Sequence, residues 1–379
     1  MVFELRKKKI LIISPQPFEG LLVSKQHYAI ELAKKGNLIY FLEPPLMDGN
    51  SFVSKEELTE YPGITLIKYK AFFNLNVRFH VRFLFDLLMH FQVKKLLNSI
   101  NDEIDIVWSF DTNLYASLSW FGAKIKIYHV VDPVKFKYQR ALGNTAHLII
   151  GVSEKILRSF SEVKVPKYFI NHGITGAYFQ LAKNLLEAGI PYEPEKTIRV
   201  GYIGNLLRGP FNYPVFQEII TNHPTHHFHF WGNDQVKNDS SVESISFMKF
   251  LKAQGNVFLH GLKKPEELVE DLRCMDAFLL AYLFIEGESD QSNSHKILEY
   301  LSTGKVVISS FVETYKGMEP LICMTAENKD NELPSLFDKI IDQLAWVNSH
   351  LHQEKRIKLA LENNYSNHIN KIENLITNL

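Results

Sequence analysis

The chain has 379 residues, enough for two domains with separate cores, and its composition, 46% hydrophobic and 22% charged, is typical of a folded protein. Lysine plus arginine and aspartate plus glutamate both number 42, which argues against a dedicated nucleic-acid-binding protein with its basic excess. The two cysteines show neither a disulfide pattern nor metal-ligand spacing, and no apolar run reaches the roughly 18 residues of a membrane span. We therefore expect a cytoplasmic protein.

Short runs rich in β-branched and aromatic residues alternate with helical patterns along nearly the whole chain, which predicts parallel sheets flanked by helices. In the first half we expect helices that include 24–35 and 77–99, and strands at 9–14, 38–42, 65–69, 104–110, 125–131, 147–152 and 168–171. In the second half, strands are expected at 198–203, 226–231, 257–260, 277–282, 306–310 and 321–324. The predicted fold class is α/β, with two Rossmann-like domains whose parallel sheets face each other across a cleft.

The segment 184–196 is the predicted linker between the domains. It contains Gly189, Pro191 and Pro194, and domain boundaries favour polar, proline-containing segments of this kind. The first domain is then expected at 1–183 and the second at 197–352. The helical pattern of 353–379 predicts a C-terminal helix, which we expect to pack back on the first domain.

The segment 290–310 carries the most informative pattern for a binding site. Asn293 and Ser294 are residue types that cap helix N-termini, and Gly304 is placed to end the helix that starts there. Free amides and the helix dipole at such an N-terminus favour an anion, for example a diphosphate. Lys296 adds a positive charge against the dipole, and a residue placed against local stability indicates function. Glu299, one turn later, is suited to a ribose diol; the alternative is a solvated helix face with a Lys–Glu pair.

The same stretch resembles the donor-binding segment of family 4-type (group 1) GT-B glycosyltransferases, which include bacterial polysaccharide enzymes. The resemblance is carried by Lys296, Glu299, Tyr300, Leu301, Gly304, Lys305, Val306 and Val307. In that family the glutamate holds the nucleotide ribose and amides at the helix start hold the phosphates, which implies these roles for Glu299 and for Asn293 with Ser294. Many members carry another glutamate, eight residues earlier, that contacts the donor sugar, and Gln291 stands at that position here.

Other landmarks of the family follow in the same order along the chain. Gly204 and Asn205, with Arg208 after them, resemble the loop near the leaving diphosphate; an ordinary strand-to-loop turn is the alternative. Trp231 ends a strand that in the family lines the nucleoside pocket, and it either stacks on the base or packs inside the protein. Gly20 lies in a loop that resembles the family's glycine-containing loop near the donor phosphates and the acceptor. The resemblance thus implies a first domain on the acceptor side and a second domain that binds the nucleotide sugar.

His129 and Asp132 end a predicted strand of the first domain and are the candidate catalytic residues, which would hold the sugar or accept the acceptor's proton. The alternative is a structural histidine and a helix-capping aspartate. No Asp-x-Asp motif for metal binding follows a strand, and His227 with His229 lack a further ligand. We therefore expect no metal site and metal-independent catalysis, and the resemblance implies retention of the anomeric configuration.

These observations predict a glycosyltransferase without a cofactor, which moves a sugar from a UDP- or GDP-linked nucleotide sugar to a saccharide or lipid-linked acceptor. A UDP-sugar 2-epimerase of the same fold is one alternative. A catalytically inactive GT-B partner subunit is another, and Gln291 keeps it open. A nicotinamide dehydrogenase is disfavoured because the first strand is followed by Gly20 alone rather than by a Gly-x-Gly-x-x-Gly motif.

The segment 78–95 is both basic and strongly apolar. One interpretation is a core helix with a solvated basic edge. The other is an interfacial surface that docks on anionic lipid near a lipid-linked acceptor, which would place the protein peripherally at the inner membrane face.

Overall fold

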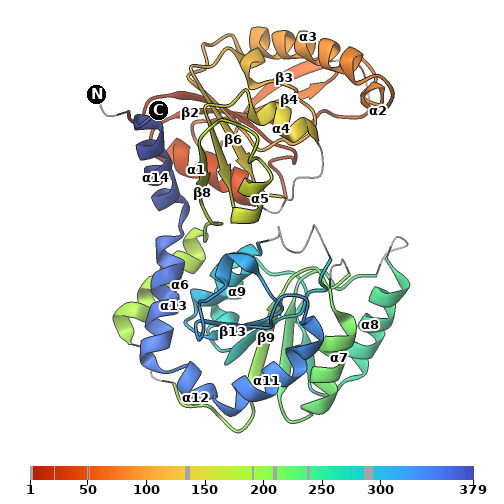
Figure 1. Ribbon diagram of the computed structural model, residues 1–379, viewed down its shortest axis with the longest axis vertical. Coiled ribbons are helices and arrows are strands. Elements are labelled where there is room, and N and C mark those ends of the chain that lie inside the picture. Colours follow the sequence, from red (N-terminus) through yellow and green to blue (C-terminus); the bar gives the residue numbers. More distant parts are fainter. Residues whose placement is uncertain are drawn as a thin grey trace. The chain divides into compact units, whose positions relative to one another are not determined.

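The computed structural model describes residues 3–20, 22–48, 50, 52–132, 137–189, 192–207, 211–236, 240–285 and 293–379. The chain forms two compact units (Figure 1). Unit 1 consists of Met1–Asn171 and Tyr365–Leu379, and unit 2 consists of His172–Asn364. Among the described helices, none is long and apolar enough to cross a membrane.

The sheet of unit 1 has, in its described part, the strand order β3-β4-β2-β1-β5-β6-β7-β8. The strands are β1 (Lys9–Ile13), β2 (Leu38–Leu42), β3 (Phe52–Glu57), β4 (Ile64–Lys70), β5 (Ile106–Ser109), β6 (Ile125–Val130), β7 (Leu148–Gly151) and β8 (Lys167–Phe169). Neighbouring strands are parallel except β3 and β4, which are antiparallel. The central strands β1, β5 and β7 are almost entirely buried, as expected of a sheet covered on both faces.

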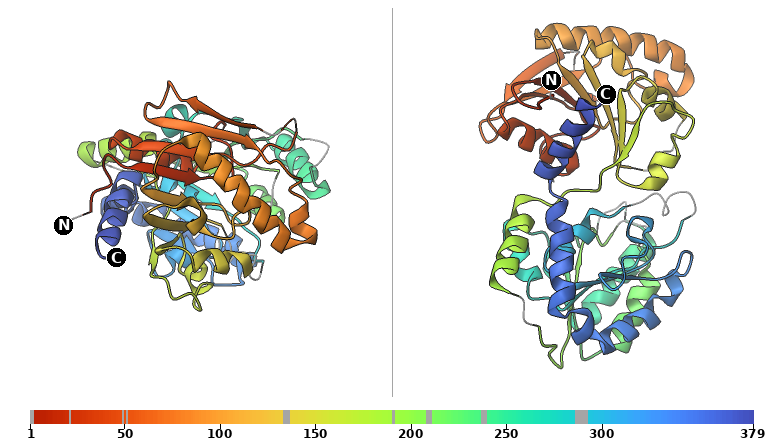
Figure 2. Two further views of the ribbon diagram at one scale, coloured as in Figure 1. Left: turned by 90° about the horizontal axis from the view of Figure 1, so that it is seen from above. Right: turned by 60° about the vertical axis from the view of Figure 1, so that its left-hand side comes forward.

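Helices cover both faces of the unit 1 sheet (Figure 2). On one face, α3 (Arg82–Ile100) buries Phe85, Met89 and Val93 in the core. On the other face, α1 (Ser24–Lys34) and α14 (Tyr365–Thr377) share a second core cluster, to which they contribute Tyr28 and Ile369. The shorter helices are α2 (Val77–His80), α4 (Lys137–Gly143), α5 (Glu154–Arg158) and the 3₁₀ turn at Leu118–Phe121.

The sheet of unit 2 has the described strand order β11-β10-β9-β12-β13-β14, and all of its neighbouring strands are parallel. The strands are β9 (Arg199–Ile203), β10 (His227–Trp231), β11 (Val257–Leu259), β12 (Ala277–Leu280), β13 (Val306–Ser309) and β14 (Ile322–Met324). The helices are α6 (Gly176–Ala188), α7 (Tyr213–Asn222), α8 (Val242–Ala253), α9 (Pro265–Leu272), α10 (His295–Leu301), α11 (Leu333–Asp342), α12 (Leu344–Val347) and α13 (His350–Glu362). This order is that of a doubly wound Rossmann-like sheet, in which the direction of winding reverses between β9 and β12.

The sequence predicted the α/β class and the strands of both sheets, and the structure confirms them with one omission. The omitted strand, β3, is the antiparallel edge strand of unit 1, and most of its residues are exposed. It therefore lacks the buried apolar run that marks the other strands. The helix predicted at 77–99 is two helices, because the backbone at Val81 leaves the helical region with φ −136° and ψ 80°.

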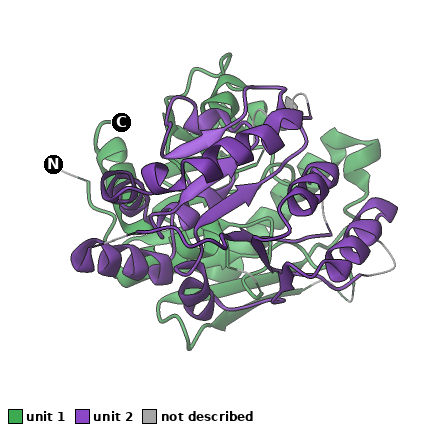
Figure 3. Cartoon of the chain, turned by 90° about the horizontal axis from the view of Figure 1, so that it is seen from below, with its two compact units in different colours: residues 1–171, 365–379 green, residues 172–364 purple. Residues whose placement is uncertain are grey.

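The boundaries of the units differ from the predicted ones. Figure 3 shows the units in separate colours, with the first boundary between 171 and 172 rather than at 183. Helix α6 accounts for the difference, since it packs against α9 and α13 of unit 2. The segment 353–379, predicted as one C-terminal helix, contains most of α13 in unit 2 and all of α14 in unit 1.

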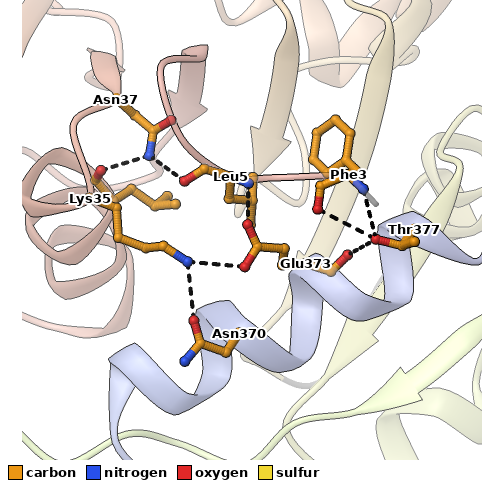
Figure 4. A network of polar contacts seen from close by, with 8 residues as sticks. Phe3, Leu5, Lys35, Asn37, Asn370, Glu373 and Thr377 are labelled. Atoms are coloured by element: carbon orange, nitrogen blue, oxygen red, sulfur yellow. Dashed lines mark hydrogen bonds and ion pairs between the residues drawn. The ribbon is translucent and has the colours of Figure 1, made fainter. Parts of the chain in front are cut away.

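Polar contacts join α14 to the N-terminal segment and to Lys35, the C-cap residue of α1 (Figure 4). The Glu373 carboxylate accepts a hydrogen bond from the backbone N–H of Leu5, and its other oxygen lies 3.1 Å from Lys35 Nζ. The Thr377 hydroxyl oxygen accepts from the backbone N–H of Phe3 at 3.2 Å. Helix α14 is therefore held in unit 1 by hydrogen bonds as well as by its buried apolar face.

Candidate functional site

The carboxyl ends of β9, β10 and β12 lie at one edge of the unit 2 sheet, because these strands are parallel. The order of the sheet makes the gap between β9 and β12 its topological switch point, which is where open α/β sheets bind ligands. Gly204 follows β9 and Gly232 follows β10. After β12, the Tyr282 hydroxyl lies 3.3 Å from that of Ser294, the residue that precedes α10. One edge of unit 2 thus collects residues from four separate parts of the sequence.

Gly204 and Gly232 allow a close approach that no larger residue permits. A Cβ atom on Gly232 would lie 1.9 Å from the backbone oxygen of Gly204. A Cβ atom on Gly204 would lie 2.5 Å from both the Lys296 ammonium and the Tyr202 hydroxyl. The missing side chain at 204 therefore lets the ammonium of Lys296 reach the end of β9.

Lys296 is half-buried on α10 and lies between two tyrosines. Its Nζ donates hydrogen bonds to the hydroxyl oxygens of Tyr202 and Tyr282, each at 3.3 Å, and lies 5.0 Å from the centre of the Tyr202 ring. Burial lowers the pKa of Lys296, but the two tyrosine hydroxyls outweigh burial and the net pKa lies above its ordinary value. Within the described chain, the structure shows no ion pair between Lys296 and a carboxylate. Among the residues that the structure describes, this edge of unit 2 therefore presents a positive charge that no salt bridge neutralises.

Glu299 lies one turn after Lys296 on α10 and is also half-buried. Burial raises the pKa of its carboxyl group to about 8, and the charge of Lys296 only partly opposes this shift. The described residues provide no hydrogen bond to this carboxyl group. A ligand with hydroxyl groups would supply the missing donors and favour the ionised form.

A pocket of about 230 Å³ adjoins this edge. Residues that follow β12, β13 and β14 line it together with the start of α10; they are Tyr282, Leu283, Phe284, Asn293, Ser294, Ser310, Phe311, Val312, Thr325, Ala326, Asn328 and Asp330. Tyr282 belongs both to the pocket and to the surroundings of Lys296, so the two adjoin. The buried hydroxyl of Thr325 has no hydrogen-bond partner among the described residues, which leaves it available to a ligand.

The structure places several predicted donor-binding residues at or near this edge. Asn293 and Ser294 directly precede α10, and Ser294 is its N-cap. The Asn205 side chain accepts a hydrogen bond from the backbone N–H of Leu207 at 2.9 Å, which shapes the loop after Gly204. Arg208 and Gln291 lie outside the described residues, so the contacts predicted for them stay predictions.

Trp231 is only 2% exposed. Its ring stacks on that of His260 with a distance of 4.8 Å between centres, and its Nε1 donates to the Asp271 carboxylate at 2.9 Å. These contacts favour the packing alternative, whereas stacking on a nucleotide base stays a prediction.

The predicted residues of unit 1 lie in three different environments. Gly20 is exposed, with φ +96°, in the loop before α1. His129 is 1% exposed, stacks on Phe110 at 4.8 Å, and accepts a hydrogen bond from Trp108 Nε1 at its Nδ1. Asp132, three residues after His129, is exposed. The burial of His129 in an aromatic cluster favours the structural alternative for this residue, and the catalytic roles of both residues stay predictions.

Sequence reasoning missed Lys25, which is 3% exposed in the first turn of α1. Burial lowers the pKa of its ammonium group, and the nearby charge of Asp132 partly offsets the shift. The signal for it was present, because a lysine in the first turn opposes the helix dipole here as it does at Lys296. Tyr202 and Tyr282 were also missed, because nothing in the local sequence marks them as hydrogen-bond partners of Lys296.

No known protein family model matches the chain, and no curated protein matches it in sequence. Solved structures do match. A sucrose-phosphate synthase from Thermosynechococcus elongatus superposes with a TM-score of 0.69 at 13% identity, over 98% of each chain. The protein HepE from Anabaena, solved with UDP and glucose, gives 0.63 at 14% identity over 98% of this chain and 100% of its own. An α,α-trehalose 6-phosphate synthase from Burkholderia multivorans gives 0.65 at 10% identity over 96% and 97%. This likeness confirms the prediction of the fold: the chain has the GT-B fold.

Proposed function

We propose that the protein is a GT-B glycosyltransferase that moves a sugar from a nucleoside diphosphate sugar, UDP- or GDP-linked, to a saccharide or lipid-linked acceptor. The observation that carries the proposal is the pair formed by Lys296 and Glu299. One is an ammonium group without a counter-ion, and the other is a carboxyl group without a hydrogen-bond donor, within the described residues. Both lie one turn apart at the switch point of unit 2, where a nucleotide presents a diphosphate beside a ribose.

Lys296 is suited to the leaving group of this reaction. Transfer breaks the bond between the anomeric carbon and the diphosphate oxygen, forms a bond from that carbon to an acceptor oxygen, and releases the acceptor's proton to a base. Negative charge grows on the diphosphate as the bond breaks, and a preorganised cation stabilises that charge. Because the tyrosine hydroxyls already hold Lys296 in its charged form, the positive charge is in place before the reaction. Metal-independent catalysis with retention of configuration belongs to this proposal.

Glu299 is suited to the ribose. An ionised carboxylate accepts hydrogen bonds from both hydroxyl groups of a diol, and bonds to a charged group are stronger than neutral ones. Burial raises the pKa of Glu299 to about 8, and the ribose hydroxyls would supply the donors that favour loss of its proton. Ribose recognition would therefore be coupled to proton release.

The structural comparisons support a UDP-linked donor in particular. Structures of the similar protein HepE were solved with UDP and with UDP-glucose. One of the similar trehalose-phosphate synthases, from Burkholderia vietnamiensis, is described as UDP-forming. The pocket beside Tyr282 is the place that we assign to part of the donor in this chain.

Thermal unfolding with UDP, GDP and ADP and their glucose conjugates tests the donor site. A ligand at 100 times its dissociation constant stabilises the folded state by roughly 2.7 kcal/mol, which shifts the melting temperature by several degrees. We expect such a shift with at least one diphosphate. The absence of a shift with all of them at millimolar concentration would refute the donor site.

Turnover assays with the preferred donor then distinguish the activities. Sugar transfer that requires an added acceptor, and that continues in EDTA, supports the proposal. Release of UDP without an acceptor and with epimerisation of the sugar would identify a 2-epimerase instead. Nucleotide binding without turnover on any acceptor would indicate an inactive partner subunit, the alternative that Gln291 keeps open.

A further inference from the structure

Helices α2 and α3 of unit 1 carry an exposed apolar stripe along their outer side. Phe83, Leu87 and Phe91 follow one another on α3 at a spacing of four residues, which places them on one face of that helix. Phe79 lies on α2, before the break in the helix at Val81. Phe79 is 68% exposed and Phe83 is 82% exposed, and Leu87 and Phe91 are about half exposed. Figure 1 shows α3 running along one margin of unit 1. We call this stripe the α2–α3 apolar face.

The apolar face is additional to the face with which α3 stabilises the fold. The inner side of α3 already buries Phe85, Met89 and Val93 in the core. Single exposed apolar residues are normal in folded proteins, whereas a contiguous row of large ones marks an interaction surface. The outer row of large apolar side chains therefore has the character of an interaction surface.

The charges around the apolar face are positive. Lys94 and Lys95 are exposed about one helical turn after Phe91, and Lys94 Nζ lies 5.6 Å from the centre of the Phe91 ring. Across 71–101 the sequence contains a single acidic residue, Asp86, and the Arg82 guanidinium pairs with it at 2.8 Å. A complementary partner surface would therefore offer an apolar layer to the aromatic side chains and negative charges to the lysines.

We propose that the α2–α3 apolar face docks on a membrane surface that contains anionic lipids. The aromatic and leucine side chains would enter the boundary between headgroups and acyl chains, while the lysines remain at the level of the lipid phosphates. Anionic lipid supplies both the apolar layer and the negative charge that this face requires. The proposal stands independently of the proposed activity, because none of these residues belongs to the donor site in unit 2.

Flotation of the full chain with lipid vesicles tests the proposal. We expect the protein to float with vesicles of phosphatidylcholine and phosphatidylglycerol, much less with phosphatidylcholine alone, and less as salt concentration rises. The double variant Phe79→Ser, Phe83→Ser should bind the mixed vesicles at least roughly tenfold more weakly. Its matched control is Val242→Ser, Leu262→Ser, which removes two equally exposed apolar side chains from unit 2 and should bind like the wild type.

A second pair of variants tests the charge. Lys94→Glu with Lys95→Glu should weaken binding to the mixed vesicles by roughly tenfold or more. Lys249→Glu with Lys252→Glu makes the same change of net charge on exposed positions of α8 and should bind like the wild type. The far-ultraviolet circular dichroism of all variants should match the wild type, since every replaced side chain is exposed.

Three results would overturn the proposal. The first is the absence of binding to mixed vesicles at low salt, and the second is binding that the α2–α3 variants and their controls lose equally. The third is self-association in the absence of lipid that Phe79→Ser, Phe83→Ser abolishes, because it would show that a second copy of the chain covers this face. Sedimentation velocity at several protein concentrations measures the third.

Discussion

Each unit places a lysine at the second position of a helix, but the two lysines have opposite environments. Lys25 in α1 of unit 1 is almost fully buried, and burial lowers the pKa of its ammonium group while Asp132 offsets only part of the shift. Lys296 in α10 of unit 2 is held by Tyr202 and Tyr282, whose hydroxyls raise its pKa in spite of burial. Both charges oppose the dipole of their helix. The dipole therefore cannot be what distinguishes them.

The hydroxyl groups of Tyr202, on β9, and of Tyr282, which follows β12, account for the difference. An ammonium group offers more N–H donors than the two tyrosine oxygens of its site accept, so Lys296 keeps a donor for a ligand together with its charge. The Lys25 ammonium donates no hydrogen bond to a described residue that would stabilise its charged form, and only the charge of Asp132 opposes the effect of burial. A lysine in a first turn thus indicates an anion site only where the fold supplies polar partners that keep it charged.

Replacing Lys296 with methionine should have the largest effect. The side chain keeps about the same length but loses the charge that we assign to the leaving diphosphate, and loss of one such group typically lowers kcat by about 10²–10³-fold. Initial rates at saturating donor measure this. Lys25→Met is the matched control, with the same replacement in the other unit, and should retain the wild-type rate. Equal losses of rate in the two variants would show that the two lysines do not differ in their importance for turnover. An unchanged rate in Lys296→Met would show that Lys296 does not stabilise the leaving diphosphate.

Replacing Glu299 with glutamine should have the next largest effect. The shape is kept, but the hydrogen bonds to the ribose lose their charge-assisted strength of about 1.5–3 kcal/mol, so affinity for the diphosphate should fall roughly ten- to a hundredfold. Titration calorimetry measures it, with Glu267→Gln on the exposed surface of α9 as the control. A 2′-deoxynucleoside diphosphate sharpens the test: the wild type should lose more affinity for it than Glu299→Gln does. Equal affinities of the wild type and Glu299→Gln for the ribonucleotide would mean that the ribose lies elsewhere.

The pKa of Glu299 also gives the direction of a pH dependence. Because burial raises the pKa from 4.5 to about 8, the folded protein holds this proton more tightly than the unfolded chain does. The contribution of Glu299 to the free energy of unfolding should therefore fall as pH rises from about 4.5 to 8. Nucleotide binding favours the ionised form, so affinity should rise by up to about tenfold per pH unit below pH 8 and then level off. Glu299→Gln should lose both dependences while the titration of the diphosphate itself remains.

The sequence predicted most of the fold because parallel strands buried on both faces have a strong local signature. Strands such as β6 and β12 are runs of buried residues bounded by turns. The antiparallel edge strand β3 has no such run, and it forms because β4 offers it a hydrogen-bonding partner. The boundary near 171 was missed for a similar reason. Gly189 and Pro191 mark the end of α6 in the sequence, but packing against α13 decides to which unit the helix belongs.

The candidate site also combines features that the local sequence predicts with features that depend on the tertiary fold. The spacing of Lys296, Glu299 and Gly304 lies within one helix and its end, so it could be read from the sequence. The hydrogen bonds from Lys296 to Tyr202 and Tyr282 join positions 94 and 14 residues apart, and they follow from the adjacency of β9 and β12, which no local pattern specifies. His129 shows a second limit of local sequence patterns. A position at a strand end is known from the pattern, but the face on which its side chain lies, here the aromatic core, depends on what packs there.

Replacing Lys25 with methionine should have the smallest effect, and its sign is the test. Methionine fills a similar volume without a charge that burial disfavours, and such replacements of buried charges are often neutral or stabilising by about 1–4 kcal/mol. Asp132 is exposed, so it remains solvated when its neighbour is removed. We therefore expect Lys25→Met to unfold at a higher urea concentration than the wild type, with an unchanged m-value and unchanged turnover. The gain should be greatest at neutral pH and shrink toward pH 10, because the lowered pKa lets the folded wild type lose its proton before the unfolded chain does. A loss of stability would contradict this expectation, because it would show that the charge of Lys25 stabilises the folded state.

A loss of turnover at unchanged nucleotide affinity would instead show that Lys25 binds the acceptor. Lys25 of unit 1 would then serve the acceptor and Lys296 of unit 2 the donor.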